Sequence, residues 1–228
     1  MNDLLKQIRD MLRVEDAKIF SSAQSSHILI EESDNNQKEN TLRKVTISVG
    51  EEFRNWFAFS PDGFLNGKNK DKKQHSLFPL LNDAEDYQKT CDCVVVMLDK
   101  NNNLRLILIE MKTSLKQTKK IARIQLTNAH KFFLCALDLK LKHLKLSLEF
   151  VGNGDEKNKL KKLKEGFQKF RNAKYDFVIL TSDKIGTRKG INRNGIYDHN
   201  FDQSGFRTIF NIKNEDERSL NYLINKNI

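Results

Sequence analysis

Apolar residues recur every three to four positions in three stretches of the chain, and this spacing predicts amphipathic helices. The stretches cover residues 3–13, 116–139 and 158–172. The third carries many lysines between Leu160, Leu163, Phe167 and Phe170, so its outer face is strongly basic. A further short helix is expected at the C-terminal end.

Shorter apolar runs, rich in β-branched residues or alternating with polar residues, predict strands. These strands are expected over residues 27–31, 44–49, 143–151, 175–181 and 206–212. In residues 143–151 the alternation is strict, with Leu144, Leu146, Leu148 and Phe150 on one side. Residues 51–59 fit either a helix or a strand. Polar segments at 32–41, 66–74 and 183–195 are expected to be loops.

The most distinct local pattern is a pair of apolar runs over residues 92–98 and 104–110, joined by five polar residues. Two such runs around a short polar turn predict a β-hairpin. Both alternating sets of positions are apolar, so both faces of the hairpin must be covered. The hairpin is therefore expected at the centre of a layered α/β or α+β domain. Since no repeat or linker interrupts the 228 residues, we expect a single domain over residues 1–228.

Composition limits the class of protein. A hydrophobic fraction of 38%, with 15 Phe, can supply a core without disulfides or a structural metal. No apolar run approaches the ~20 residues of a membrane span, and charges in the first helix argue against a signal peptide. Cys91 and Cys93 form a C-x-C pair on a strand, and buried structural thiols are favoured over zinc ligands. A cytoplasmic, reducing location is expected.

The positive charge is concentrated in one segment. The chain has a formal net charge of +10, yet residues 112–193 hold 21 basic and 7 acidic residues, against 19 and 23 elsewhere. Such a segment attracts polyanions and favours nucleic acid as a partner. A Lys-rich compositional background is the alternative. The basic helix at 157–171 and the loop at 184–190 either contact phosphates or form solvated surface.

The open end of the hairpin gathers charged groups. If the turn is symmetric about Asn101, Asp92 lies opposite Glu110, with Cβ atoms roughly 4.5–5.5 Å apart. Lys112 lies two residues beyond Glu110 and shares its face. Two carboxylates ~5 Å apart repel by roughly 3 kcal/mol at an effective dielectric constant near 20. Mg²⁺ or Mn²⁺ would reverse this repulsion, and Lys112 could orient an attacking water. The alternative is a solvated surface ion pair of little energetic consequence.

These residues resemble the core of the PD-(D/E)XK nuclease superfamily. The resemblance covers the segment from Asp92, through the Glu110-Met111-Lys112 motif, to the helix that holds Gln125. It implies a restriction-endonuclease-like fold, with a central mixed β-sheet flanked by helices on both sides, and a catalytic core over about residues 85–185. The QxxxY pattern of some members is incomplete here, since Ala129 replaces the aromatic residue.

The resemblance also implies site roles. Asp92 and Glu110 would bind catalytic Mg²⁺ or Mn²⁺ with the backbone carbonyl of Met111, while Lys112 and Gln125 would complete the catalytic residues. Many members add an acidic residue, and here Glu51 or Glu52 could serve. The basic side chains expected to contact DNA are Lys116, Lys119, Lys120, Arg123, Lys184, Arg188 and Lys189.

The sequence thus predicts a Mg²⁺-dependent endonuclease that acts on DNA, either a restriction or a phage-defence enzyme. Symmetric cutting of a duplex would require a homodimer. One alternative is a non-catalytic nucleic-acid-binding protein with the same fold, and another is a protein in which the hairpin is purely structural. His130 is expected on the polar face of its helix. The aromatic residues Phe53, Trp56, Phe57 and Phe59 are expected in the core rather than in a base-stacking surface.

Overall fold

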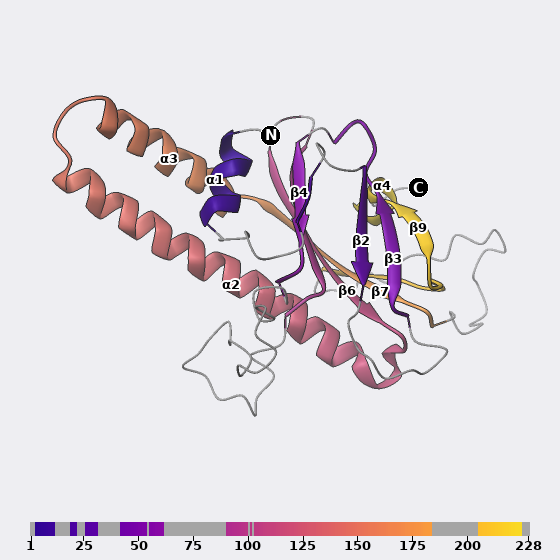
Figure 1. Ribbon diagram of the computed structural model, residues 1–228. Coiled ribbons are helices and arrows are strands. Elements are labelled where there is room, and N and C mark those ends of the chain that lie inside the picture. Colours follow the sequence, from indigo (N-terminus) through magenta and orange to yellow (C-terminus); the bar gives the residue numbers. More distant parts are fainter. Residues whose placement is uncertain are drawn as a thin grey trace, which may run out of the picture.

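A six-stranded mixed sheet forms the centre of the computed structural model, and two long helices extend beyond its edge (Figure 1). The structure describes residues 3–11, 19–21, 26–31, 42–53, 55–61, 90–99, 101, 103–183 and 205–224. The helices are α1 (Asp3–Met11), α2 (Leu115–Phe150), α3 (Asp155–Arg171) and α4 (Leu220–Ile224). The strands are β1 (Ile19–Ser21), β2 (His27–Glu31), β3 (Lys44–Ser48), β4 (Trp56–Phe59), β5 (Cys93–Leu98), β6 (Leu104–Lys112), β7 (Lys174–Thr181), β8 (Phe206–Ile209) and β9 (Asp216–Ser219).

The large sheet has the strand order β1-β4-β5-β6-β7-β8. The pairs β1-β4, β4-β5 and β5-β6 are antiparallel, whereas β6, β7 and β8 run parallel to one another. Parallel neighbours need a crossover connection, and α2 with α3 provides it between β6 and β7. A second, three-stranded sheet has the order β2-β3-β9 and is also mixed. The described residues thus form a mixed α+β fold, as the sequence predicted.

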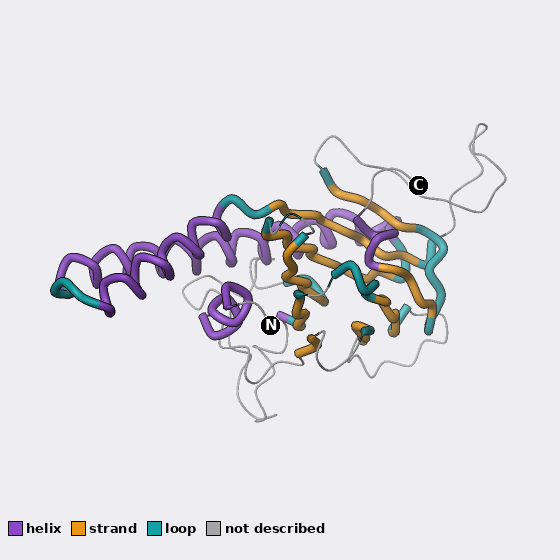
Figure 2. The backbone as a smooth tube through the Cα atoms, turned by 90° about the horizontal axis from the view of Figure 1, so that it is seen from above, coloured by secondary structure: helices purple, strands orange, loops and turns teal. Residues whose placement is uncertain are grey.

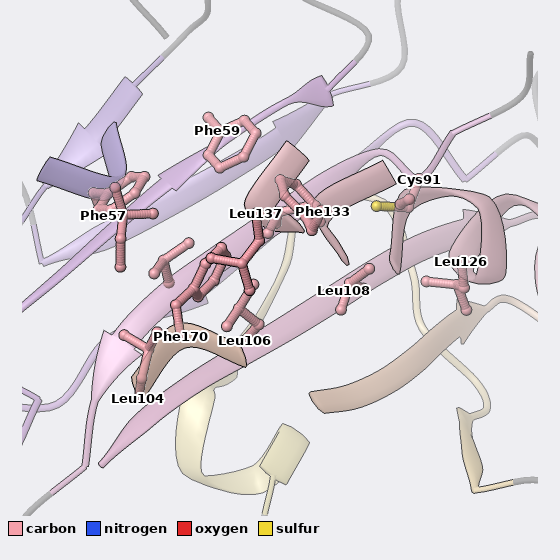
Figure 3. Close-up of a cluster of buried hydrophobic side chains, with 14 of the residues drawn as sticks. Phe57, Phe59, Cys91, Leu104, Leu106, Leu108, Leu126, Phe133, Leu137 and Phe170 are labelled. Atoms are coloured by element: carbon pink, nitrogen blue, oxygen red, sulfur yellow. The ribbon is translucent and has the colours of Figure 1, made fainter. Parts of the chain in front are cut away.

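Helices cover one face of the large sheet. Leu106 and Leu108 of β6 lie in one buried cluster with Leu126 and Phe133 of α2 and with Phe170 of α3 (Figure 3). Helix α1 packs on α3, where Gly166 permits the close approach, since a Cβ there would lie 3.0 Å from a methyl carbon of Leu4. This cluster buries one of the two apolar sets of hairpin positions.

The other face of the large sheet is covered by the second sheet and α4. Val95 and Ile107 of the hairpin are buried there with Ile28 of β2, Ile47 of β3 and Leu223 of α4. The expected burial of the hairpin on both faces is therefore confirmed. Helices thus lie on both sides of the large sheet, as expected, but the helix on this second side is the five-residue α4. The alternating apolar residues of β2 and β3 add a sheet beside it.

The strand predicted over residues 143–151 is wrong, because residues 143–150 belong to the 36-residue helix α2 and Val151 is its C-cap. The alternating leucines do not mark one buried face: Leu144 is buried, while Leu146 is 55% and Phe150 86% exposed. Leu137, Leu141 and Leu144 instead recur at helical spacing and lie in one cluster with apolar residues of α3. Figure 2 shows α2 and α3 lying side by side beyond the sheet. The two helices α2 and α3 form an antiparallel helical pair. We call the part of this pair over residues 139–171 the arm.

The other predicted helices and strands are present, but some of them begin or end at different residues than predicted. Residues 51–59 resolve into a turn followed by β4, and the last predicted strand ends at Ile209. The sequence missed β1, which has three residues, and β9, which has no apolar side chain. Phe53, Trp56, Phe57 and Phe59 are buried, as predicted. The predicted loops at 32–41 and 66–74 lie outside the described residues, as does most of the loop at 183–195. In the described parts of the chain, no helix combines the length and apolar character that crossing a membrane requires.

Candidate active site

The hairpin has the register that the sequence predicted. Cys93 pairs with Ile109 and Val94 with Leu108, so paired positions are symmetric about Asn101. The turn is held by the Asp99 carboxylate, which accepts hydrogen bonds from the backbone N–H groups of residues 101 and 103. The ladder ends at Cys93, and one further step brings Asp92 beside Glu110.

The carboxylates of Asp92 and Glu110 each accept a backbone hydrogen bond across this open end. The backbone N–H of Asp92 donates to Oε2 of Glu110 at 3.2 Å. The backbone N–H of Met111 donates to Oδ2 of Asp92 at 2.6 Å. Hydrogen bonds to carboxylates are stronger than those between neutral groups, and here they fix both acidic side chains on the strand ends.

Lys112 completes the group by pairing with the Oε1 atom of Glu110. Glu110 is 0% exposed, and the side chain of Lys112 is only 17% exposed. The alternative interpretation of a solvated surface ion pair is therefore wrong. Burying two charges carries a desolvation penalty that is offset only when the partners and their hydrogen bonds are in place. Replacing a buried ion pair with apolar residues is often neutral or stabilising, so stability alone gives no reason for this pair.

Gln125 reaches the same region from α2. Its side-chain amide donates to the carbonyl of Thr90 at 3.0 Å, two residues before Asp92. Thr90 is 2% exposed, and its hydroxyl has no hydrogen-bond partner among the described residues, nor has the Oε1 atom of Gln125. Gln125 thus holds the segment that leads into Asp92. Sequence reasoning missed Thr90, because no periodic pattern marks a residue three positions before a strand.

A second network fixes the start of α2, three residues after Lys112. The Asp183 carboxylate accepts a hydrogen bond from the backbone N–H of Leu115 at 2.5 Å, and the Ser114 hydroxyl accepts one from the N–H of residue 116. The Ser182 hydroxyl donates to the carbonyl of residue 113 at 2.6 Å. The end of β7 thereby clamps the connection between the E-x-K motif and α2. Ser114 carries an N-cap signature in the sequence, but only the fold brings Asp183 to it.

The oxygen-only donors of this site suit a hard divalent cation. Asp92, Glu110 and the carbonyl of Met111 are the groups that would hold it. Across the described residues there is no group of three or more His, Cys, Asp or Glu side chains that could bind a metal. Neither Glu51 nor Glu52 therefore adds a third carboxylate to the pair, and Glu52 instead accepts a hydrogen bond from Asn221 of α4.

The two neighbouring cysteines behave as buried thiols. Cys91 and Cys93 are both free and lie in the two different core clusters, on opposite sides of the large sheet. Burial, reinforced by the charge of Asp92, raises the pKa of the Cys93 thiol, so that it stays protonated. This agrees with the structural role that the sequence favoured.

His130 does not lie on the polar face of α2, which corrects the sequence prediction. Its ring packs against Tyr175 and Phe177 of β7, with centroid distances of 4.2 and 5.4 Å. Burial lowers the pKa of His130 and raises the pKa of Tyr175 to about 12. The polar ring was a poor guide to orientation because its flat faces can still pack against aromatic rings.

The structure places four of the seven predicted DNA contacts, all on the first turns of α2. Lys116 and Lys120 are exposed, and Lys119 is half-exposed. The guanidinium of Arg123 lies 5.6 Å from the ring centroid of Phe206 in β8, so this side chain is directed to the sheet edge. The other three, Lys184, Arg188 and Lys189, lie outside the described residues.

Comparisons with known proteins identify no relative. No model of a known protein family matches the chain. Searches of curated proteins and of solved structures also find no match. The function is therefore inferred from the contacts and charges of this chain.

Proposed function

We propose that the chain is a metal-dependent endonuclease of the PD-(D/E)XK type, which hydrolyses phosphodiester bonds in DNA. The observation that carries the proposal is the fully buried Glu110, contacted by the backbone of Asp92 and by the ammonium of Lys112. Its place at the open end of an apolar hairpin, followed directly by a long basic helix, fits this type of nuclease. The mixed central sheet supports the restriction-endonuclease-like fold.

Each side chain of the site has a distinct role in this proposal. Asp92 and Glu110, with the carbonyl of Met111, would hold Mg²⁺ or Mn²⁺, which supplies charge stabilisation at the phosphate when bound. Lys112 donates hydrogen bonds that orient the attacking water and stabilises negative charge developing on the phosphate oxygens. Gln125 positions Asp92 through the carbonyl of Thr90.

Plasmid cleavage tests the proposal. Purified protein should nick or cut plasmid DNA with Mg²⁺ or Mn²⁺ and should not cut it in excess chelator. Glu110→Gln and Lys112→Met should abolish cutting while DNA binding persists. Lys44→Met is a matched control, because Lys44 faces Glu215 at 4.0 Å in an exposed pair far along the sequence from the site. Cleavage that persists in both site variants would refute the assignment.

One observation favours a non-catalytic nucleic-acid-binding protein instead. At least three of the four carboxylate oxygens of Asp92 and Glu110 already accept hydrogen bonds or an ion pair from the protein. Such a pair could be satisfied without a metal. Tight DNA binding with no cutting under any divalent cation would support this alternative.

The biological setting follows from the same proposal. For such a DNA endonuclease we propose a restriction or phage-defence role in the cytoplasm. Symmetric cutting of both strands of a duplex requires a second copy of the chain, so we propose a homodimer on DNA. Sedimentation with and without a duplex measures that state directly.

A further inference from the structure

A line of exposed lysines follows the whole length of α2. At about 100° per residue, five of its lysines fall within a sector of roughly 80° around the helix axis. They are Lys116, Lys120, Lys131, Lys142 and Lys145, and all five are exposed. The first and last are 29 residues apart in the sequence, which is about 44 Å along a helix with a rise of 1.5 Å per residue. We call these five residues the lysine track.

The lysine track ends in a groove between α2 and α3. This arm groove has a volume of about 510 Å³ and is lined by the basic side chains of Lys142, Lys145, Lys164 and Arg171. The rest of its lining is Asp138, Leu141, Gln168 and Asn172. Its one acidic side chain lies 3.8 Å from the Arg171 guanidinium, so the groove keeps a net positive charge.

The whole arm is basic, with ten Lys or Arg and four Asp or Glu over residues 139–171. Such a density of positive charge is destabilising by itself, because like charges on adjacent helices repel. A polyanion in the groove would remove this repulsion. The amides of Gln168 and Asn172 add neutral hydrogen-bond donors of the kind that contact phosphate oxygens.

We propose that the lysine track and the arm groove bind the phosphate backbone of duplex DNA beyond the cleavage site. This inference rests on the proposed nuclease function, since the track begins four residues after Lys112. Duplex DNA presents regular negative charge along its axis, and a track of about 44 Å matches about 13 base pairs at 3.4 Å each. An acidic protein segment carries negative charge only where its sequence places Asp or Glu, whereas every nucleotide of DNA carries it.

The geometry gives the substrate a minimum length. Lys142 and Lys145 lie 17 and 20 residues after Gln125, or about 25–30 Å along α2. A duplex must therefore extend about 8 base pairs from the site towards the arm before it reaches the groove. A duplex of about 12 base pairs centred on the site reaches only about 20 Å and should miss the groove.

DNA affinity measured in chelator, without cleavage, tests the inference. The groove variant combines Lys142→Gln, Lys145→Gln and Lys164→Gln. The matched control combines Lys159→Gln, Lys162→Gln and Lys169→Gln, which removes the same charge from exposed residues of α3 that do not line the groove. Fluorescence anisotropy gives Kd for labelled duplexes of about 12 and about 40 base pairs.

The groove variant should bind the long duplex at least tenfold more weakly than the control does, with the short duplex little changed. Its salt dependence for the long duplex should also fall by about 2–3 ion equivalents. Equal affinities of the two variants for the long duplex overturn the inference, even if plasmid is cut normally. An acidic protein would then be the partner to test for the groove. A groove-dependent affinity with no cutting in Mg²⁺ or Mn²⁺ upholds DNA binding by the track and groove but refutes the nuclease function on which the cleavage site depends.

Discussion

Replacing Lys112 with methionine removes the cation that neutralises a fully buried carboxylate. Methionine keeps much of the aliphatic chain, so the change is mainly one of charge. Because Glu110 is 0% exposed, the variant leaves its carboxylate buried without its ammonium partner. Breaking a buried ion pair from one side costs about 3–5 kcal/mol of unfolding free energy. For a chain of this size, that corresponds to a fall in Tm of roughly 6–20 °C.

A double-mutant cycle isolates the pair. Glu110→Gln keeps an acceptor for the Asp92 N–H while it removes the charge, so Glu110→Gln/Lys112→Met should be more stable than Lys112→Met alone. Urea unfolding followed by the fluorescence of Trp56, the single Trp of the chain and only 1% exposed, measures each free energy. Lys44→Met, in an exposed pair, should cost about 1 kcal/mol or less.

Divalent cations extend this experiment to the proposed site. In Lys112→Met, a bound Mg²⁺ would compensate the two carboxylates, so excess Mg²⁺ should recover part of the lost Tm. The double variant, which lacks the Glu110 charge, should recover much less. The electrostatic reasoning is refuted if Lys112→Met lies within about 1 kcal/mol of the wild type, or if the two substitutions are additive.

Three further predictions follow from contacts elsewhere in the fold. Gln125→Leu leaves the buried carbonyl of Thr90 without its donor, so thermal unfolding should show a loss of about 1–3 kcal/mol, and any plasmid cleavage should slow. Arg105→Met breaks a largely buried ion pair with Asp176, in which the N–O distances are 2.5 and 3.0 Å. The free energy of unfolding, measured in urea, should fall by about 3–5 kcal/mol. Since burial lowers the pKa of His130, the unfolded chain binds its proton more readily, and stability should fall as pH drops below about 6.5. His130→Gln should flatten that part of the curve of Tm against pH; an unchanged slope would place the pH dependence in other groups.

The sequence was most informative where one local pattern had one structural solution. The hairpin register followed from turn symmetry and from the need to bury both apolar faces, and it brought Asp92, Glu110 and Lys112 together. The same reasoning failed at residues 143–151, where leucines fit both a strand and a helix. Packing against α3 decides in favour of the helix. Because α3 follows later in the chain, the pattern of residues 143–151 does not contain this contact. The sequence alone also did not reveal that Phe150, an apolar residue of the predicted strand, is exposed.

The sequence alone determined the β-hairpin and its register, the segment that carries the positive charge, and which charged groups meet at the open end. Tertiary structure decided that Glu110 and Lys112 are buried, that Thr90 and Asp183 support the site, and that a sheet covers the second face. It also turned dispersed lysines of α2 and α3 into one track and groove. The physical reason is that register and periodicity act between near neighbours in the sequence. Burial and the pairing of distant side chains depend on contacts that only the folded chain creates.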